Sequence, residues 1–129
     1  MSRTPVVTAG APRPVGPYSQ AIVSGDLVFC AGQVGLDPAT GRLVQGGTAA
    51  EAARAIENLS AVLSAAGATL ADVVKTTVYV VDLQEWGLVN EVYGRYFPTP
   101  APARATVQVA ALPAGARVEI EAIAVRQRA

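Results

Sequence analysis

Apolar and polar residues alternate along several stretches of the chain, and this period of two predicts β-strands. We expect a short edge strand at residues 4–8 and a hairpin from 19–24 and 27–33, because Gly25 and Asp26 suit a tight two-residue turn. The clearest strand is 73–81. Its predicted faces are Val74, Thr76, Val78 and Val80 on one side, and Val73, Lys75, Thr77, Tyr79 and Val81 on the other.

The last predicted strand covers residues 117–126. One face carries Val118, Ile120, Ala122 and Ala124, and the other carries Arg117, Glu119, Glu121, Ile123 and Val125. Two acids on a face that then turns apolar leave two interpretations open. They belong to a half-exposed sheet end paired with Arg117, or one acid is partly desolvated and acts as a general base or water-binding group.

A period of 3.6 residues predicts two helices. The first begins at a capping box formed by Thr48 and Glu51 and ends at Gly67, which favours a left-handed conformation. Its apolar stripe consists of Ala52, Ile56, Leu59, Leu63 and Ala66. The second begins at a cap from Asp82 and runs to about Phe97, with Trp86, Val89, Tyr93 and Tyr96 at helical spacing. Asn90 interrupts this helix, either as a satisfied core amide or as a ligand contact.

Alternating prolines at residues 98–102 predict a stiff, extended connector, because proline fixes φ and lacks a backbone donor. Arg104 lies where this connector ends. An arginine on a rigid support suits bidentate binding of a carboxylate, although a solvated surface arginine fits the same pattern.

The elements follow the order β, ββ, α, β, α, ββ, which predicts one α+β domain over 1–129, a mixed sheet with two helices packed on one face. Apolar residues make up 51% of the chain and charged residues only 16%, which indicates burial of surface against copies of the same chain. The N-terminus lacks the apolar region of a secretory signal, and no segment has the length of a membrane span, so we expect a cytoplasmic protein.

Composition excludes several kinds of chemistry. The absence of histidine excludes Ser-His and Cys-His nucleophile pairs and histidine metal ligands. Cys30 is the only cysteine, so an internal disulfide is excluded and a core role is expected. Ten basic and ten acidic residues cancel, which argues against nucleic acid and anionic membranes as partners. The remaining chemistry must use carboxylates, arginine, hydroxyls, amides and the backbone.

Several segments together resemble the RidA (YjgF-like) family of enamine/imine deaminases, in order and over nearly the whole chain. The matching segments are GPYSQA at 16–21, AGQV at 31–34, DPATG at 37–41, VKTTVYV at 74–80, VNEVY at 89–93, PAR at 102–104 and EIEAIA at 119–124.

This resemblance implies a chorismate-mutase-like subunit assembled as a homotrimer, with active sites between subunits. It implies hydrolysis of 2-imino or enamino acids, such as 2-iminopropionate, to the 2-keto acid and ammonia without a cofactor or metal. By position, Arg104 resembles the carboxylate-binding arginine and Glu119 the acid that positions water. Tyr18, Gly32 and Asn90 resemble pocket residues.

Two pocket positions depart from the family pattern. Ala31 stands where the best-known members have a serine, and Thr106 where many have a cysteine. They keep a second hypothesis open, a non-catalytic trimer that binds 2-keto acids or has a regulatory role. Some family members have been described as ribonucleases or translation inhibitors, which the balanced charge does not favour here.

Overall fold

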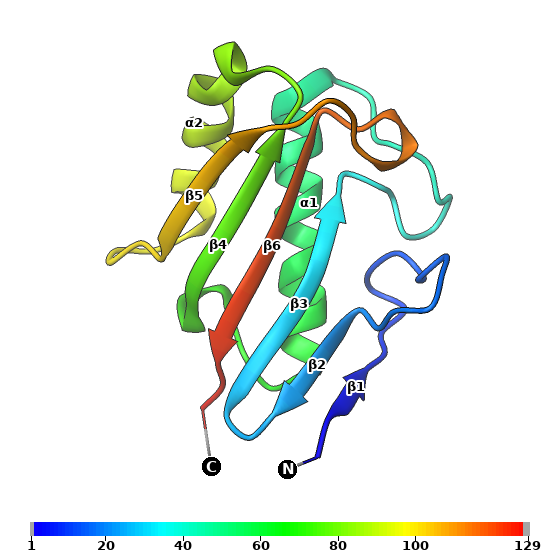
Figure 1. Ribbon diagram of the computed structural model, residues 1–129, viewed down its shortest axis with the longest axis vertical. Coiled ribbons are helices and arrows are strands. Elements are labelled where there is room, and N and C mark those ends of the chain that lie inside the picture. The colour runs from blue at the N-terminus through cyan, green and yellow to red at the C-terminus, as the bar shows by residue number, and fades with distance from the viewer. Residues whose placement is uncertain (1, 128–129) are drawn as a thin grey trace.

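The computed structural model describes residues 2–127, which form one twisted sheet with both helices on the same face (Figure 1). The six strands lie in the order β1-β2-β3-β6-β4-β5. Their bounds are β1 Thr4–Val6, β2 Ala21–Ser24, β3 Leu27–Val34, β4 Val73–Val80, β5 Ala103–Gln108 and β6 Val118–Val125. The helices are α1 Gly47–Ala65 and α2 Trp86–Tyr96, and three short 3-10 helices are η1 Leu70–Asp72, η2 Leu83–Glu85 and η3 Pro113–Gly115.

The sheet is mixed, as the sequence predicts. β5 runs parallel to β4, and every other pair is antiparallel. The parallel pair is possible because α2 provides the crossover between the two strands. The predicted hairpin is confirmed, with Gly25 at φ 61 in the turn between β2 and β3.

The core lies between the sheet and α1. Ile56, Leu59 and Leu63 are fully buried on the predicted stripe of α1, opposite the buried residues Val118, Ile120, Ala122 and Ala124 of β6. Cys30 belongs to this core, and burial raises the pKa of its thiol to about 12. The prediction of a core cysteine is therefore confirmed.

The predicted capping box at the start of α1 is wrong. The helix begins after Gly46, which has φ 117, and no side chain caps it. Thr48 and Glu51 instead bond across the fold. The Thr48 hydroxyl donates to Glu85 of η2 at 3.0 Å, and Glu51 accepts the backbone N–H of Arg117 at 2.8 Å. The N-terminus of α1 lies against η2 and the start of β6, so the side chains of Thr48 and Glu51 bond to these elements and do not cap the helix.

The C-terminus of α1 follows the prediction. Gly67 has φ 84, its N–H donates to the carbonyl of Ser64, and the next N–H, of Ala68, donates to that of Leu63. These are the two bonds of a Schellman motif, and glycine adopts this left-handed position without steric cost. Asp82 also caps as predicted, since its Oδ1 accepts the N–H of Gln84, but it caps η2, and α2 follows directly.

One predicted strand face is wrong at its first two residues. The register of β4 against β6 shifts between Val73 and Lys75, and this bulge buries Val73 while leaving Val74 47% exposed. An inserted residue reverses the alternation on one side of a bulge. From Lys75 onward the faces agree with the prediction. The proline-rich residues 98–102 are neither helix nor strand, as predicted, although a bend at Thr99 and Pro100 interrupts the expected extended course.

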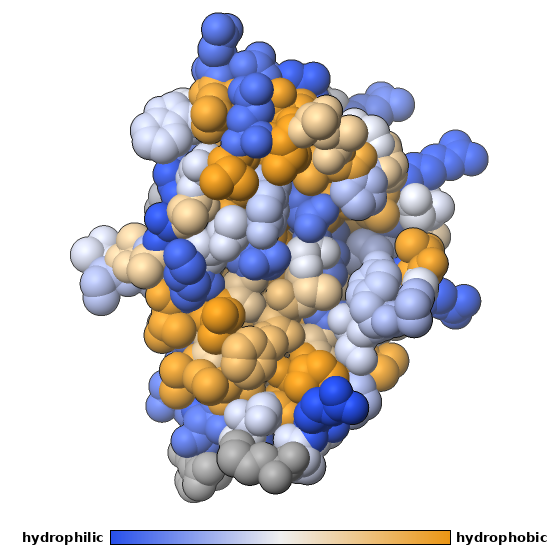
Figure 2. All heavy atoms as spheres, viewed as in Figure 1, coloured by the Kyte–Doolittle hydropathy of each residue, from blue (hydrophilic) through white to orange (hydrophobic). Residues whose placement is uncertain are grey.

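The sheet face away from the helices, which we call the open face, is covered by no helix of residues 2–127. It carries alternate residues of β4 and β6 from Lys75 to Tyr79 and from Glu119 to Val125. Figure 2 shows this face, with apolar residues gathered where β3 begins and β6 ends; Leu27, Phe29 and Val125 are each about 40% exposed there. Neither helix described has the length and apolarity needed to cross a bilayer.

Candidate functional site

The expected site residues fall into two groups on different sides of the sheet. Asn90, Arg104 and Thr106 lie between β5 and α2. Tyr18, Gly32 and Glu119 line one cavity beside the open face, and Ala31 directly precedes Gly32 in β3. We call these the arginine group and the glutamate group.

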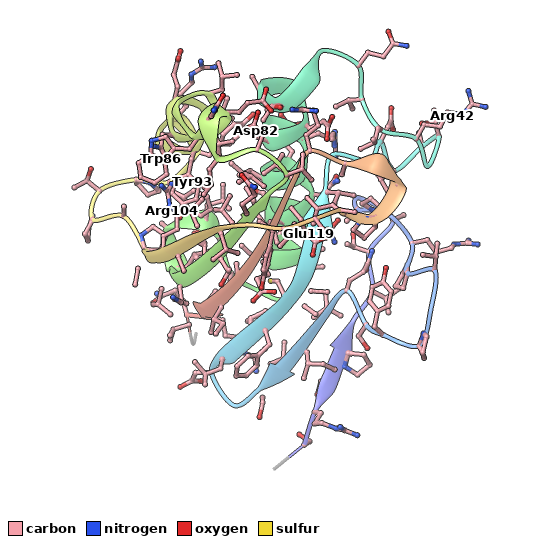
Figure 3. The ribbon with its side chains drawn as sticks, turned by 45° about the horizontal axis from the view of Figure 1, so that its top comes forward. Arg42, Asp82, Trp86, Tyr93, Arg104 and Glu119 are labelled. Carbon is pink, nitrogen blue, oxygen red and sulfur yellow. The ribbon has the colours of Figure 1, made fainter. Side chains whose placement is uncertain are left out.

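Arg104 lies over the helix face of the sheet because it pairs with Thr76, whose side chain is buried toward α2. Its Nη2 donates to Oδ1 of Asn90 at 2.6 Å. The guanidinium carbon lies 4.8 Å from the centroid of the Tyr93 ring and 5.7 Å from that of Trp86. Figure 3 shows the side chains of Trp86, Tyr93 and Arg104 converging. The aromatic rings and the amide hold the guanidinium in one orientation.

The support of Arg104 is itself fixed. The hydroxyls of Tyr93 and Thr76 lie 2.7 Å apart and share a buried hydrogen bond, and the Tyr93 ring stacks on Phe97 with centroids 4.3 Å apart. Burial raises the pKa of Tyr93. No carboxylate among residues 2–127 pairs with Arg104. Its other N–H groups therefore remain available for an anion.

Asn90 is a half-buried partner of the arginine, so its amide oxygen is satisfied within the chain, and a contact of Asn90 with a ligand stays a prediction. Thr106 lies on the same face of β5 as Arg104, because it pairs with the core-facing Val78. The helical spacing of Trp86 and Tyr93 in the sequence predicts that they share one side of the helix. It does not predict that both rings contact Arg104, as the structure shows.

Glu119 lies on the open face near the start of β6, where it is half-buried. A Cβ atom at Gly32 would lie 2.1 Å from Oε2 of Glu119, so the carboxylate rests directly on the glycine backbone. Burial, and secondarily the charge of Glu121, raises the pKa of Glu119. Arg117 pairs with neither acid of this face, because its side chain bonds to Glu85 and Thr48 instead.

The cavity of the glutamate group has a volume of about 280 Å³. Its walls come from the loop before β2, the part of β3 where the register against β6 shifts between Cys30 and Gln33, η3, and the start of β6. The lining includes Arg13, Val15, Tyr18, Gly32, Pro113, Ala114 and Glu119. The cavity volume is just below the usual range for small-molecule pockets, roughly 300–1,000 Å³, and suits a ligand of few heavy atoms.

Arg104 and Glu119 do not meet within one chain. Arg104 is opposite Thr76 of β4 and Glu119 is opposite Tyr79, on the other face of the sheet. The two positions are three residues apart along β4, about 10 Å, and two strand spacings apart, about another 10 Å. Figure 3 shows them well separated.

No cluster of three potential metal ligands occurs among the residues described. The two groups provide an arginine with N–H donors that no carboxylate among residues 2–127 occupies and an acid with a raised pKa. Residues of these types can bind a small anion and orient a water molecule.

The family model described as endoribonuclease L-PSP matches residues 8–126. The chain belongs to this family, the RidA family. Human 2-iminobutanoate/2-iminopropanoate deaminase is 48% identical over 96% of this chain and 90% of its own length. The crystal structure of RidA from an Antarctic Psychrobacter species superposes with a TM-score of 0.92 at 46% identity, covering 95% of this chain and 99% of the other.

A second solved relative carries a ligand. Escherichia coli TdcF, determined with bound serine, has a TM-score of 0.90 at 37% identity, covering 96% of this chain and 99% of its own. The family resemblance found in the sequence is therefore confirmed, and so is the α+β subunit architecture of this RidA-family chain.

Proposed function

We propose that this RidA-family protein hydrolyses 2-imino and enamino acids to 2-keto acids and ammonia. The observation that carries the proposal is the near full-length match, at about half identity, to proteins named 2-iminobutanoate/2-iminopropanoate deaminase. The geometry supports it because both groups consist of the residue types that this hydrolysis needs.

In the proposed mechanism, Arg104 binds the carboxylate of the imino acid. Asn90 occupies one N–H of the guanidinium, and the remaining N–H groups offer the fork that accepts two carboxylate oxygens. Fixing the carboxylate places C2 at a defined distance from the glutamate group, which is worth on the order of several kcal/mol of barrier in favourable cases.

Glu119 positions the attacking water and accepts its proton. Water adds to C2 of the protonated imine to form a carbinolamine. Glu119 returns the proton to the nitrogen and then takes the proton of the carbinolamine hydroxyl as the C–N bond breaks, which releases ammonia and the 2-keto acid; ammonia finally takes the proton from Glu119. The raised pKa of Glu119 brings this carboxylate closer to the operating pH, where a general base exchanges protons best. The protonated imine is already electrophilic, so the mechanism requires no cofactor.

We further propose that the site forms between subunits of a homotrimer. Since Arg104 and Glu119 lie on opposite faces of one sheet, an active constellation needs Arg104 of one copy beside Glu119 of another. The exposed apolar residues of the open face, Leu27, Phe29 and Val125, support a second copy as their cover.

Ala31 and Thr106 complete the proposed substrate-binding set. Ala31 has no hydroxyl, and its backbone N–H already donates to the carbonyl of Gln20 at 3.0 Å. Thr106 retains a hydroxyl on the face of Arg104. We expect Ala31 to widen the pocket slightly and Thr106 to replace a thiol by a hydrogen-bonding group.

The test is keto-acid release from imino acids generated in place by an amino acid oxidase. We expect acceleration over buffer, and a loss of at least a hundredfold in Arg104→Ala and in Glu119→Gln. If the wild-type protein does not accelerate keto-acid release, the proposed deaminase activity is refuted. If calorimetry then still detected 2-keto acid binding, the non-catalytic binding trimer would replace it.

Nucleic acid is not proposed as a partner, despite the name of the family model. The ten basic and ten acidic residues leave no net charge to attract phosphates. We expect no shift of a labelled single-stranded RNA at low salt; salt-sensitive binding would contradict this.

A further inference from the structure

The cavity that contains Glu119 has a second charged residue in its wall, Arg13. Arg13 is exposed, and among residues 2–127 it has no hydrogen-bond or ion-pair partner. Nothing in the proposed hydrolysis of a simple 2-imino acid uses it. An arginine that lines a ligand-sized cavity and has unpaired N–H donors is a candidate for binding an anion.

Arg13 stands on a rigid support. Pro12 and Pro14 flank it and each fixes its own φ, which limits the backbone around the arginine. The buried side chain of Gln20 clamps the same loop, because its Nε2 lies 3.0 Å from the carbonyl oxygen of Pro12 and 3.3 Å from that of Ala11. Its Oε1 accepts the N–H of Thr8 at 2.8 Å, which ties the loop to the segment after β1. With the backbone held, only the side chain of Arg13 has to be ordered when it binds a carboxylate.

The charges in the cavity restrict what Arg13 can bind. Glu119 repels a second carboxylate, so a ligand with two acidic groups needs a cation on another wall. Arg13 is the only basic residue among those of 2–127 that line the cavity. Glu119 and Arg13 form no ion pair with each other, although both line the same cavity of about 280 Å³, so a small ligand in this cavity can contact both.

We propose that Arg13 binds a distal acidic group of the substrate, so that 2-imino dicarboxylic acids of four or five carbons are preferred over 2-imino monocarboxylic acids. This inference rests on the proposed function and names its substrate class. Arg104 takes the carboxylate next to the imine, Glu119 directs water to C2, and Arg13 takes the carboxylate at the far end of the chain.

The first experiment compares kcat/KM for the imines generated from glutamate and from alanine, in wild type, Arg13→Gln and Arg42→Gln. Arg42 is the matched control, since it is another exposed loop arginine and points away from Glu119 in Figure 3. We expect the glutamate-to-alanine ratio to fall about tenfold or more in Arg13→Gln, the loss of one charge-assisted bond, and to stay unchanged in Arg42→Gln. Added salt should reduce the wild-type preference, because Arg13 is exposed.

The second experiment measures binding of 2-oxoglutarate and 2-oxobutanoate by calorimetry in the same three proteins. A wild-type preference for the diacid that Arg13→Gln abolishes supports the proposal even if no imine is turned over, and this separates it from the deaminase assay. Equal affinities in wild type, or a preference that survives Arg13→Gln, would overturn it. Circular dichroism of Arg13→Gln checks that the variant is folded.

Discussion

Contact between a backbone and a carboxylate defines the site at the scale of single residues. Gly32 lets Glu119 lie on the floor of the cavity because no side chain separates them. The same closeness partly desolvates the carboxyl group and contributes to its raised pKa. Glycine is thus required here for space, and not for an unusual backbone conformation.

Gly32→Ala should displace Glu119, since the new Cβ would lie 2.1 Å from its Oε2. We expect kcat/KM to fall on the order of a hundredfold, the effect of misplacing a catalytic group by about 1 Å. Steady-state kinetics on the alanine-derived imine provides the measurement. Gly87→Ala is the control, because a Cβ at this helical position meets nothing within 4 Å and should stabilise the fold by roughly 0.5–1 kcal/mol.

Glu119→Gln should make stability less dependent on pH. The pKa of Glu119 is raised on folding, so its neutral form is favoured in the native state, and stability from this group is lost as the pH rises above its unfolded value of 4.5. We expect the variant to gain melting temperature relative to wild type at pH 7 and to lose that gain near pH 4. If the melting temperatures of variant and wild type differ by the same amount at both pH values, Glu119 does not titrate with a raised pKa.

Long-range side-chain bonds join three elements at the top of the molecule. Arg117, just before β6, bonds to Glu85 of η2 and to Thr48 in the first turn of α1, and its backbone N–H donates to Glu51. This cluster sets where β6 begins, and Glu119 follows two residues later. Through this cluster, η2 and α1 help to fix the start of β6 and with it the position of Glu119.

Glu85→Gln tests this cluster. The hydrogen bond from Arg117 lowers the pKa of Glu85, so its contribution to stability is present above the unfolded value of 4.5 and is lost as the pH falls through the folded value. We expect a melting temperature lower by a few degrees at pH 7, with little difference at pH 3. Glu91→Gln, which breaks only an exposed pair with Arg95, should change stability by less than about 0.5 kcal/mol.

For the whole molecule, the question is how Arg104 and Glu119 come together. One chain keeps them on opposite sides of its sheet, so the site proposed above requires Arg104 of one copy beside Glu119 of another. The open face carries exposed apolar residues at the end of β6 and Glu119 at its start, and it is the surface that this assembly would use (Figure 2).

Mixing two inactive variants tests the shared site. When Arg104→Ala and Glu119→Gln chains are unfolded together and refolded, mixed trimers should contain some sites with both native residues. Random assembly gives about a quarter of wild-type activity, because each site draws its two residues from different chains. Activity that stays at the level of the separately refolded variants would place both residues of each site in one chain.

Much of the fold follows from local patterns in the sequence. Period-two alternation predicts β2, β3, β4 and β6, the 3.6-residue stripe predicts α1, and Gly67 marks its end, because these signals depend on neighbours a few residues away. The candidate site residues likewise come from segments that match the family. Arg13 is the exception, since its sequence of Pro-Arg-Pro indicates a loop and nothing about the cavity.

Tertiary structure decided the features that depend on distant partners. The bonds of Thr48 and Glu51 to η2 and Arg117 replaced a capping box that the local sequence favours, and the bulge in β4 moved Val73 into the core. The division of the expected site into two groups is also tertiary, because the strand order and the face of each residue follow from pairing across the sheet. The sequence motifs alone were enough to propose the site residues; the fold decided that one chain holds Arg104 and Glu119 apart, because strand pairing places them on opposite faces of the sheet.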